Sequence, residues 1–141
     1  MKTEEINKAM ENYSGFVGTF PSDEIPDIEP NEGVIVNTDT KDKPGTHWIA
    51  IYRPEHASVE YFDSFGLPPL IPQIIDYMNK IAGPRGWTYS ISSLQHEESD
   101  SCGQHCLNFL KHRLLQLPMT HILTHLTADR LKNDYIVKHG M

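Results

Sequence analysis

Residues 47–63 read HWIAIYRPEHASVEYFD, and this stretch decides the fold that we expect for the 141-residue chain. Its two runs of β-branched and aromatic residues, 47–53 and 58–63, are typical of strands. The connection between them, PEHA, is short and polar, which favours an antiparallel hairpin. A hairpin in the middle of the chain therefore anchors the predicted sheet.

The length of the hairpin loop sets which side chains face one another. A five-residue loop, 53–57, places His47 opposite Asp63 at the open end of the hairpin. The same register pairs apolar residues on one buried face: Ile51 with Val59, and Ile49 with Tyr61. Directly opposed Cβ atoms are about 4.5–5.5 Å apart, so an imidazole can reach a carboxylate there. The alternative is that His47 and Asp63 simply end two strands in solvent.

Hydrophobic spacing along the rest of the chain predicts one α+β domain over residues 1–141. Further strands are predicted at 33–38 and 87–92, and a polar turn at 39–46. Helices are predicted at 3–12, at 70–81, from Cys102 to residue 117 and, in one or two pieces, at 119–141. Residues 15–33 are rich in proline, glycine and acids, so we expect an irregular segment there. These elements indicate a small, mostly antiparallel sheet flanked by helices.

The composition excludes several classes of function. The net charge is −7 and the 12 Lys and Arg residues form no basic patch, so nucleic-acid binding is not expected. The N-terminus lacks the apolar core of a signal peptide, so we do not expect secretion. No apolar run approaches the roughly 20 residues of a membrane helix. Two cysteines in an unexported chain are expected to stay reduced.

Both cysteines lie in the stretch QHEESDSCGQHC, residues 95–106, and three hypotheses explain them. With His121 and His125, Cys102 and Cys106 form the spacing C-x3-C-x14-H-x3-H, which is close to a Cys2His2 zinc site. Against zinc, both cysteines fall at the start of a helical repeat, whereas zinc fingers place theirs on a tight turn. A disulfide between the two cysteines would close a single helical turn under strain.

The third hypothesis makes Cys102 a nucleophile. A polar residue of the segment 99–101 can cap the helix, which places Cys102 in the first turn. There the helix dipole and the free N–H groups favour the thiolate. Cys106, one turn further on, is expected in the core. With the His47–Asp63 pair upstream, Cys102 completes a set of base, orienting acid and nucleophile.

Three neighbouring residues fit the nucleophile hypothesis. Gln95 could donate its side-chain amide to an oxyanion, alongside the backbone N–H of Cys102. Gly103 leaves room for a substrate beside the sulfur, and the ring of Trp48 could pack over the edge of the site. Without the triad, Gln95 would be read as a solvent-facing loop residue and Trp48 as a core residue.

Two segments together resemble the adenovirus-type maturation proteases (the adenain family), of the same clan as the SUMO-specific proteases. They are GTHWIAIYRPEHASVEYFDSFGLPP (45–69) and LQHEESDSCGQHCLNFL (94–110). The combined His-Trp, Asp-Ser-Phe-Gly and Gln-x6-Cys-Gly spacings carry the resemblance, which covers roughly residues 16–116. It implies an α+β papain-like fold, circularly permuted relative to papain, with the chain order His–Asp–Cys.

The resemblance also implies a cysteine endopeptidase that matures virion precursor proteins, cutting after small residues such as Gly. In it His47 is the base, Asp63 the acidic partner, Gln95 the oxyanion donor and Cys102 the nucleophile. The substrates that the resemblance implies are polypeptides, namely capsid precursors, cleaved in the virion or in the infected host cell. Trp48 and Gly103 would contact the substrate.

Two features of the adenoviral enzymes are not expected here. Those enzymes use DNA as a cofactor and a peptide disulfide-linked to a further cysteine. This chain is acidic and has no third cysteine, so we expect no cofactor, and any activator to be a non-covalent capsid protein. Two alternatives stay open: a protease for ubiquitin-like modifiers with the same triad, and a zinc-stabilised binding module without enzymatic activity.

Overall fold

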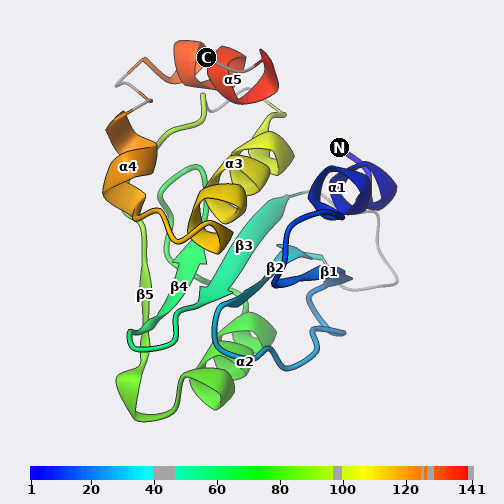
Figure 1. Cartoon of the computed structure of the whole chain (residues 1–141), viewed down its shortest axis with the longest axis vertical. Coiled ribbons are helices and arrows are strands. Elements are labelled where there is room, and N and C mark those ends of the chain that lie inside the picture. The colour runs from blue at the N-terminus through cyan, green and yellow to red at the C-terminus, as the bar shows by residue number, and fades with distance from the viewer. Residues whose placement is uncertain (40–46, 97–99, 125, 127–128, 140–141) are drawn as a thin grey trace.

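The computed structural model describes residues 1–39, 47–96, 100–124, 126 and 129–139. Its elements are, in order, α1 (Thr3–Met10), β1 (Phe16–Pro21), β2 (Glu32–Asn37), β3 (Trp48–Arg53), β4 (Val59–Phe62), α2 (Pro72–Ala82), η1 (Gly83–Arg85), β5 (Trp87–Tyr89), α3 (Cys102–Leu114), α4 (Met119–Thr124) and α5 (Arg130–His139). Helices flank one five-stranded sheet, so the expected α+β class is confirmed (Figure 1). The turn predicted at 39–46 lies, apart from Asp39, outside the described residues.

The sheet is mixed and has the strand order β1-β2-β3-β4-β5. The two central pairings, β2 with β3 and β3 with β4, are antiparallel. The two outer pairings, β1 with β2 and β4 with β5, are parallel. The expectation of a mostly antiparallel sheet therefore holds only for its centre. Strand β5 is also shorter than predicted, and residues 90–95 run on without regular structure.

Strand β1 was not predicted from the composition of its segment. The proline and glycine content of residues 15–33 predicts an irregular segment, yet Phe16–Pro21 pairs in parallel with β2. The register shifts between Phe16 and Gly18, and Gly18 has a φ of +150°, so a bulge lets the strand follow its partner. Pro21 is tolerated because it ends an edge strand.

The β3–β4 hairpin has a different register from the expected one. Ile51 pairs with Tyr61 and Ala50 with Phe62, a displacement of two residues, so the prediction that His47 directly faces Asp63 is wrong. The connection is longer than predicted: Ser58 lies outside the β3–β4 ladder and donates its hydroxyl to the backbone carbonyl of Arg85. A shift of two preserves the face of every side chain, so Ile51 and Tyr61 still share a buried face.

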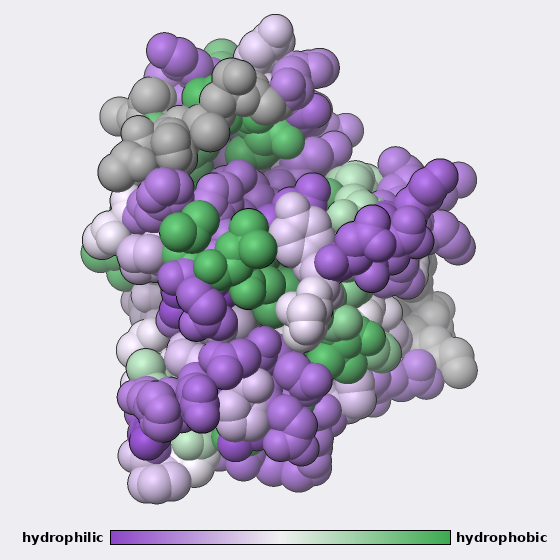
Figure 2. All heavy atoms as spheres, viewed as in Figure 1, coloured by the Kyte–Doolittle hydropathy of each residue, from purple (hydrophilic) through white to green (hydrophobic). Residues whose placement is uncertain are grey.

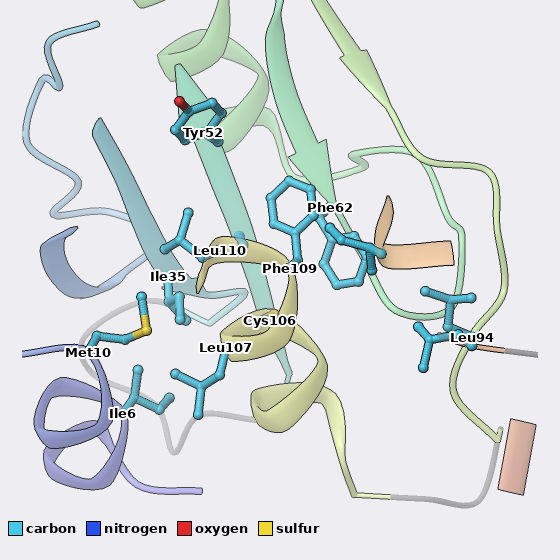
Figure 3. Close-up of a cluster of buried hydrophobic side chains, with 13 residues drawn as sticks. Ile6, Met10, Ile35, Tyr52, Phe62, Leu94, Cys106, Leu107, Phe109 and Leu110 are labelled. Carbon is cyan, nitrogen blue, oxygen red and sulfur yellow. The ribbon is translucent and has the colours of Figure 1, made fainter. Parts of the chain in front are cut away.

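Each face of the sheet carries its own hydrophobic cluster. On one face α2 covers alternate residues of β2, β3 and β4, among them Val34, Ile49 and Tyr61. On the other face α1 and α3 cover the intervening residues. Figure 3 shows side chains of α1 and α3, including Met10, Cys106 and Leu110, gathered against Ile35 and Phe62 of the sheet. Helix α3 is thereby anchored on the sheet, which fixes the position of its first residue, Cys102.

The face of the molecule drawn in Figure 2 is largely hydrophilic. The face drawn in Figure 2 carries apolar side chains in small groups near its middle. Large exposed hydrophobic residues, such as Leu70, Ile91 and Leu131, belong to separate parts of the chain. Scattered residues of this kind are ordinary for globular domains and mark no site by themselves. Within the described residues, no helix combines the length and the apolar character that a membrane span needs.

Candidate active site

Cys102 begins helix α3 and is buried, with 8% of its surface exposed. Burial by itself raises the pKa of a thiol, but contacts with His47 and with the backbone of Trp48 and Gly103 outweigh it and lower the pKa of Cys102. N–H groups at a helix start and a nearby imidazole both favour the thiolate. The thiol therefore has the surroundings that activate a nucleophile.

His47 lies one residue before β3, and its ring connects Cys102 with Asp63. The Nε2 atom is 3.2 Å from Oδ1 of Asp63, but the ring is not turned for a straight hydrogen bond to this oxygen. Catalytic contacts of this kind commonly tighten when a substrate binds. Burial disfavours the charged imidazole, yet contacts with Asp63 and Cys102 outweigh burial and raise the pKa of His47 to about 9. The predicted pair forms although its predicted register is wrong.

The sequence Asp-Ser-Phe-Gly, residues 63–66, folds into a turn that aims the carboxylate. The N–H of Gly66 donates to the carbonyl of Asp63 over 2.8 Å, and Asp and Gly are favoured at the first and last positions of such a turn. The N–H of Phe65 donates to Oδ1 of Asp63, also over 2.8 Å. The Phe65 ring stacks on the imidazole of His47 with centroids 5.3 Å apart. One turn thus supplies the acid and packs against the ring that the acid orients.

Ser64 of the same turn holds Gln95. The backbone N–H groups of Leu94 and Gln95 both donate to the carbonyl of Ser64, over 2.8 and 3.0 Å. The Ser64 hydroxyl donates to Oε1 of Gln95, whose side chain is buried. Because the amide oxygen is the acceptor in this contact, the NH2 group is the end that can donate to an oxyanion. This geometry fits the role predicted for Gln95.

Ser64 and Phe65 are supporting residues that sequence reasoning missed. Only the spacing of the Asp-Ser-Phe-Gly motif was used in the resemblance, and no role was predicted for Ser64 or Phe65. The signal that could have found them is the turn pattern itself, since an Asp and a Gly three residues apart at a strand end favour a tight turn. Such a turn places the residues between them beside the acid.

Trp48 and Gly103, the predicted substrate contacts, both lie against Met1. The indole N–H of Trp48 donates to the carbonyl of Met1 over 3.1 Å. A Cβ atom added to Gly103 would lie 3.1 Å from both Cβ and Sδ of Met1. The side chain of Met1 therefore fills part of the room expected beside Gly103. Substrate contact by Trp48 and Gly103 stays a prediction, and it requires Met1 to move aside.

Cys106 is a core residue, as predicted. It is fully buried, and burial raises the pKa of its thiol well above the usual value. Both cysteines are free thiols. Within the part of the chain that the structure describes, no three His, Cys, Asp or Glu side chains are grouped to hold a metal ion. His125, the fourth ligand of the zinc hypothesis, lies outside that part.

Comparison with known proteins shows similarity to viral cysteine proteases. No protein family profile matches the chain. A cysteine protease of African swine fever virus, from a Malawi tick isolate, is 30% identical over 107 residues, which are 69% of this chain and 39% of the relative. A protein from a Kenyan pig isolate of the same virus, named a SUMO-1 cysteine protease, is 29% identical over 107 residues.

Solved structures of the African swine fever virus protease are also similar to this chain. One superposes with a TM-score of 0.59 and 20% identity and covers 97% of this chain and 64% of that chain. Another has a TM-score of 0.55 and 24% identity and covers 77% of this chain and 43% of that chain. The chain therefore shares the fold of that protease over the superposed part.

The similarity covers only part of each relative. The chain spans 39% of the length of the curated relatives that it matches. These relatives agree with the cysteine-protease part of the resemblance noted in the sequence. The more specific likeness to the adenovirus enzymes stays a prediction.

Proposed function

We propose that this protein is a cysteine endopeptidase of viral origin with the triad His47, Asp63 and Cys102. The observation that carries the proposal is the imidazole of His47, which lies 3.2 Å from the Asp63 carboxylate and also lowers the pKa of the Cys102 thiol. Base, acid and thiol come from two strand ends and a helix start, and such convergence is the geometry of nucleophilic catalysis. The similarity to viral cysteine proteases supports the same reaction.

The proposed reaction is acyl transfer. His47 takes the proton of Cys102, and the thiolate attacks the carbonyl carbon of the scissile peptide bond. The oxyanion that forms accepts hydrogen bonds from the side-chain amide of Gln95 and from the backbone N–H of Cys102, which the helix start leaves unused. His47 then protonates the leaving amine. Water, activated by His47, hydrolyses the thioester and restores the thiol.

The proposed substrates are precursor proteins of a virion, cleaved after small residues such as Gly in the virion or the infected cell. The support is the resemblance of the sequence motifs to maturation proteases, together with the viral origin of the similar proteins. The proposed activator is a capsid protein that binds non-covalently. Of the two cysteines, one is the proposed nucleophile and the other is buried in the core, so neither is available to link a partner covalently.

Hydrolysis of peptides with Gly before the scissile bond tests the proposal. The wild type should cleave them, and Cys102→Ala should reduce cleavage to background because the covalent step is lost. Cys106→Ala is the matched control and should keep most of the activity. No cleavage of any Gly-containing peptide or viral precursor by the wild type, or undiminished cleavage by Cys102→Ala, would contradict the proposal.

A second candidate is a protease for ubiquitin-like modifiers. The specific support is that one similar viral protein carries the name SUMO-1 cysteine protease. The two candidates share the triad and differ in how the substrate is recognised. Cleavage of a SUMO-1 precursor at low enzyme concentration, with capsid precursors left intact, would favour the modifier protease. The reverse preference would favour the maturation protease.

A further inference from the structure

Helix α5 buries two polar residues and exposes two apolar ones. Asn133 and Asp134 are 0% and 6% exposed, whereas Leu131 and Tyr135 are 62% and 64% exposed. A surface helix normally does the reverse, and burying a carboxylate costs free energy unless hydrogen bonds compensate it. The buried side chains of Asn133 and Asp134 therefore need hydrogen-bond partners on the inner side of the helix.

Among the described residues, three donors form hydrogen bonds with the carboxylate of Asp134. The Ser101 hydroxyl donates to Oδ1 over 2.7 Å, Nε2 of His105 lies 2.8 Å from the same oxygen, and the backbone N–H of His96 donates to Oδ2 over 3.2 Å. Burial lowers the pKa of His105 despite the neighbouring carboxylate, so the ring is neutral and Nε2 carries the proton that is donated.

The partners of α5 flank the two residues that form the oxyanion site. His96 follows Gln95, and Leu94 precedes it, with its carbonyl accepting a hydrogen bond from Nδ2 of Asn133 over 3.2 Å. Ser101 directly precedes Cys102. Ser101 is the N-cap of α3, yet among the described residues its hydroxyl caps no helix N–H and turns to Asp134 instead.

We propose that Asp134, assisted by Asn133, is a positioning residue that holds the segments carrying Gln95 and Cys102 in the geometry of an oxyanion site. The inference rests on the proposed function. Gln95 and Cys102 lie on different segments, so their two N–H donors converge only if the segments are held together. Among the described residues, Asp134 contacts one residue beside each donor, His96 and Ser101, and neither contact is with a reacting atom. Catalytic donors must be held within about 0.5 Å to act, and a 1 Å displacement can cost about 100-fold in rate.

The substitution Asp134→Asn tests this role because it keeps the size of the side chain and replaces one acceptor oxygen with a donor. We expect kcat for a Gly-containing peptide to fall roughly tenfold or more, with KM changed less than about threefold. Iodoacetamide alkylates Cys102 without forming an oxyanion, so we expect its rate to stay within about twofold of wild type. Asp100→Asn is the matched control, because Asp100 pairs with Lys138 of α5 in solvent, and it should leave all three quantities unchanged.

A parallel loss of hydrolysis and alkylation would show that Asp134 only stabilises the whole site, and unchanged hydrolysis would also overturn the inference. If Asp134→Asn does not fold, Ser101→Ala removes one of the hydrogen bonds and should give a smaller loss of kcat with unchanged alkylation. Hydrogen exchange separates this inference from the proposed function. Even if the wild type cleaves no peptide, the His96 amide should exchange faster in Asp134→Asn, and equal exchange would overturn the positioning role.

Discussion

His47 decides at which pH the reacting groups of the site hold their charges. Its pKa is raised to about 9 from 6.5, so the folded protein binds this proton more tightly than the unfolded chain. The resulting stabilisation is complete below pH 6.5 and is lost as the pH rises through about 9. Cys102 behaves in the opposite way, since its pKa is lowered and its stabilisation is lost as the pH falls. Thiolate and imidazolium coexist between the lowered pKa of Cys102 and the pKa of about 9 of His47.

The first prediction concerns Asp63→Asn. In the wild type, peptide hydrolysis should decline as the pH rises through about 9, because the imidazolium that protonates the leaving amine is lost. The variant lacks the carboxylate that raises the pKa of His47, so the alkaline decline should move toward neutral pH, and kcat should fall by about 10- to 100-fold. The measurement is the pH profile of kcat. An unmoved alkaline limb would show that Asp63 does not act on the imidazole.

The second prediction distinguishes the two thiols. At neutral pH, iodoacetamide should modify Cys102 quickly and leave Cys106 unmodified, because Cys106 is fully buried and burial raises its pKa. Mass spectrometry of digested protein after timed alkylation measures both rates. Unfolded protein is the control and should react at both positions. Equal rates in the folded protein would argue strongly against Cys102 as the nucleophile.

At the scale of the elements, periodicity predicted which segments form helices and strands, but not how the strands are paired. Runs of β-branched and aromatic residues predicted β3 and β4, and both strands bury apolar residues on each face. The register was not predicted because the hairpin connection is longer than the five residues assumed, and Ser58, expected in the strand, instead donates to the distant backbone carbonyl of Arg85. Strand β1 was missed because pairing with β2 overrides the weak strand propensity of Gly18 and Pro21.

The candidate site was more predictable than the register for a physical reason. His47, Asp63 and Cys102 sit at or next to element ends, where a shift of two residues can be absorbed by a turn, and Gln95 lies in the irregular segment after β5. The turn at residues 63–66 does this, bringing Oδ1 of Asp63 to 3.2 Å from His47. Met1 at Gly103 and Asp134 near Ser101 could not be foreseen, because both contacts join distant parts of the chain.

The third prediction concerns the glycine of that turn. Gly66 has a φ of +74°, and an added Cβ would lie 2.7 Å from the backbone oxygen of Ile91. Gly66→Ala should therefore lower the free energy of unfolding by about 1–3 kcal/mol. Ile91 lies four residues before Gln95, so a displacement of its backbone should also move Gln95 and reduce kcat. Urea unfolding and peptide hydrolysis measure the two effects.

Gly83→Ala is the matched control for the turn glycine. Gly83 also has a positive φ, +57°, but among the described residues nothing lies within 4 Å of the added Cβ. It should lose about 1 kcal/mol from backbone strain alone and keep full activity. If both variants lost the same stability and kept the same activity, the close approach of Gly66 to the Gln95 segment would be irrelevant to the site.

For the whole molecule, charge decides which large partners can assist catalysis. The net charge is −7. Several basic side chains are already paired within the fold: Arg113 with Glu60, Lys80 with Asp27 and Lys138 with Asp100. DNA binding gains most of its free energy when Lys and Arg contacts release counterions from the phosphates, and an acidic surface is repelled by DNA at long range. This chain therefore offers DNA little binding free energy.

The fourth prediction is that proteolysis needs neither DNA nor a disulfide-linked peptide. The isolated protein, or the protein with a non-covalent capsid partner, should cleave a Gly-containing peptide at the same rate with and without duplex DNA. A covalent activator would need an acceptor thiol, but Cys102 is the proposed nucleophile and Cys106 is fully buried. The measurement is kcat/KM across a salt series, with Cys102→Ala as the blank. A strong stimulation by DNA that weakens as salt rises would contradict the prediction, because that salt dependence is the signature of phosphate contacts and would require a basic track on the folded surface.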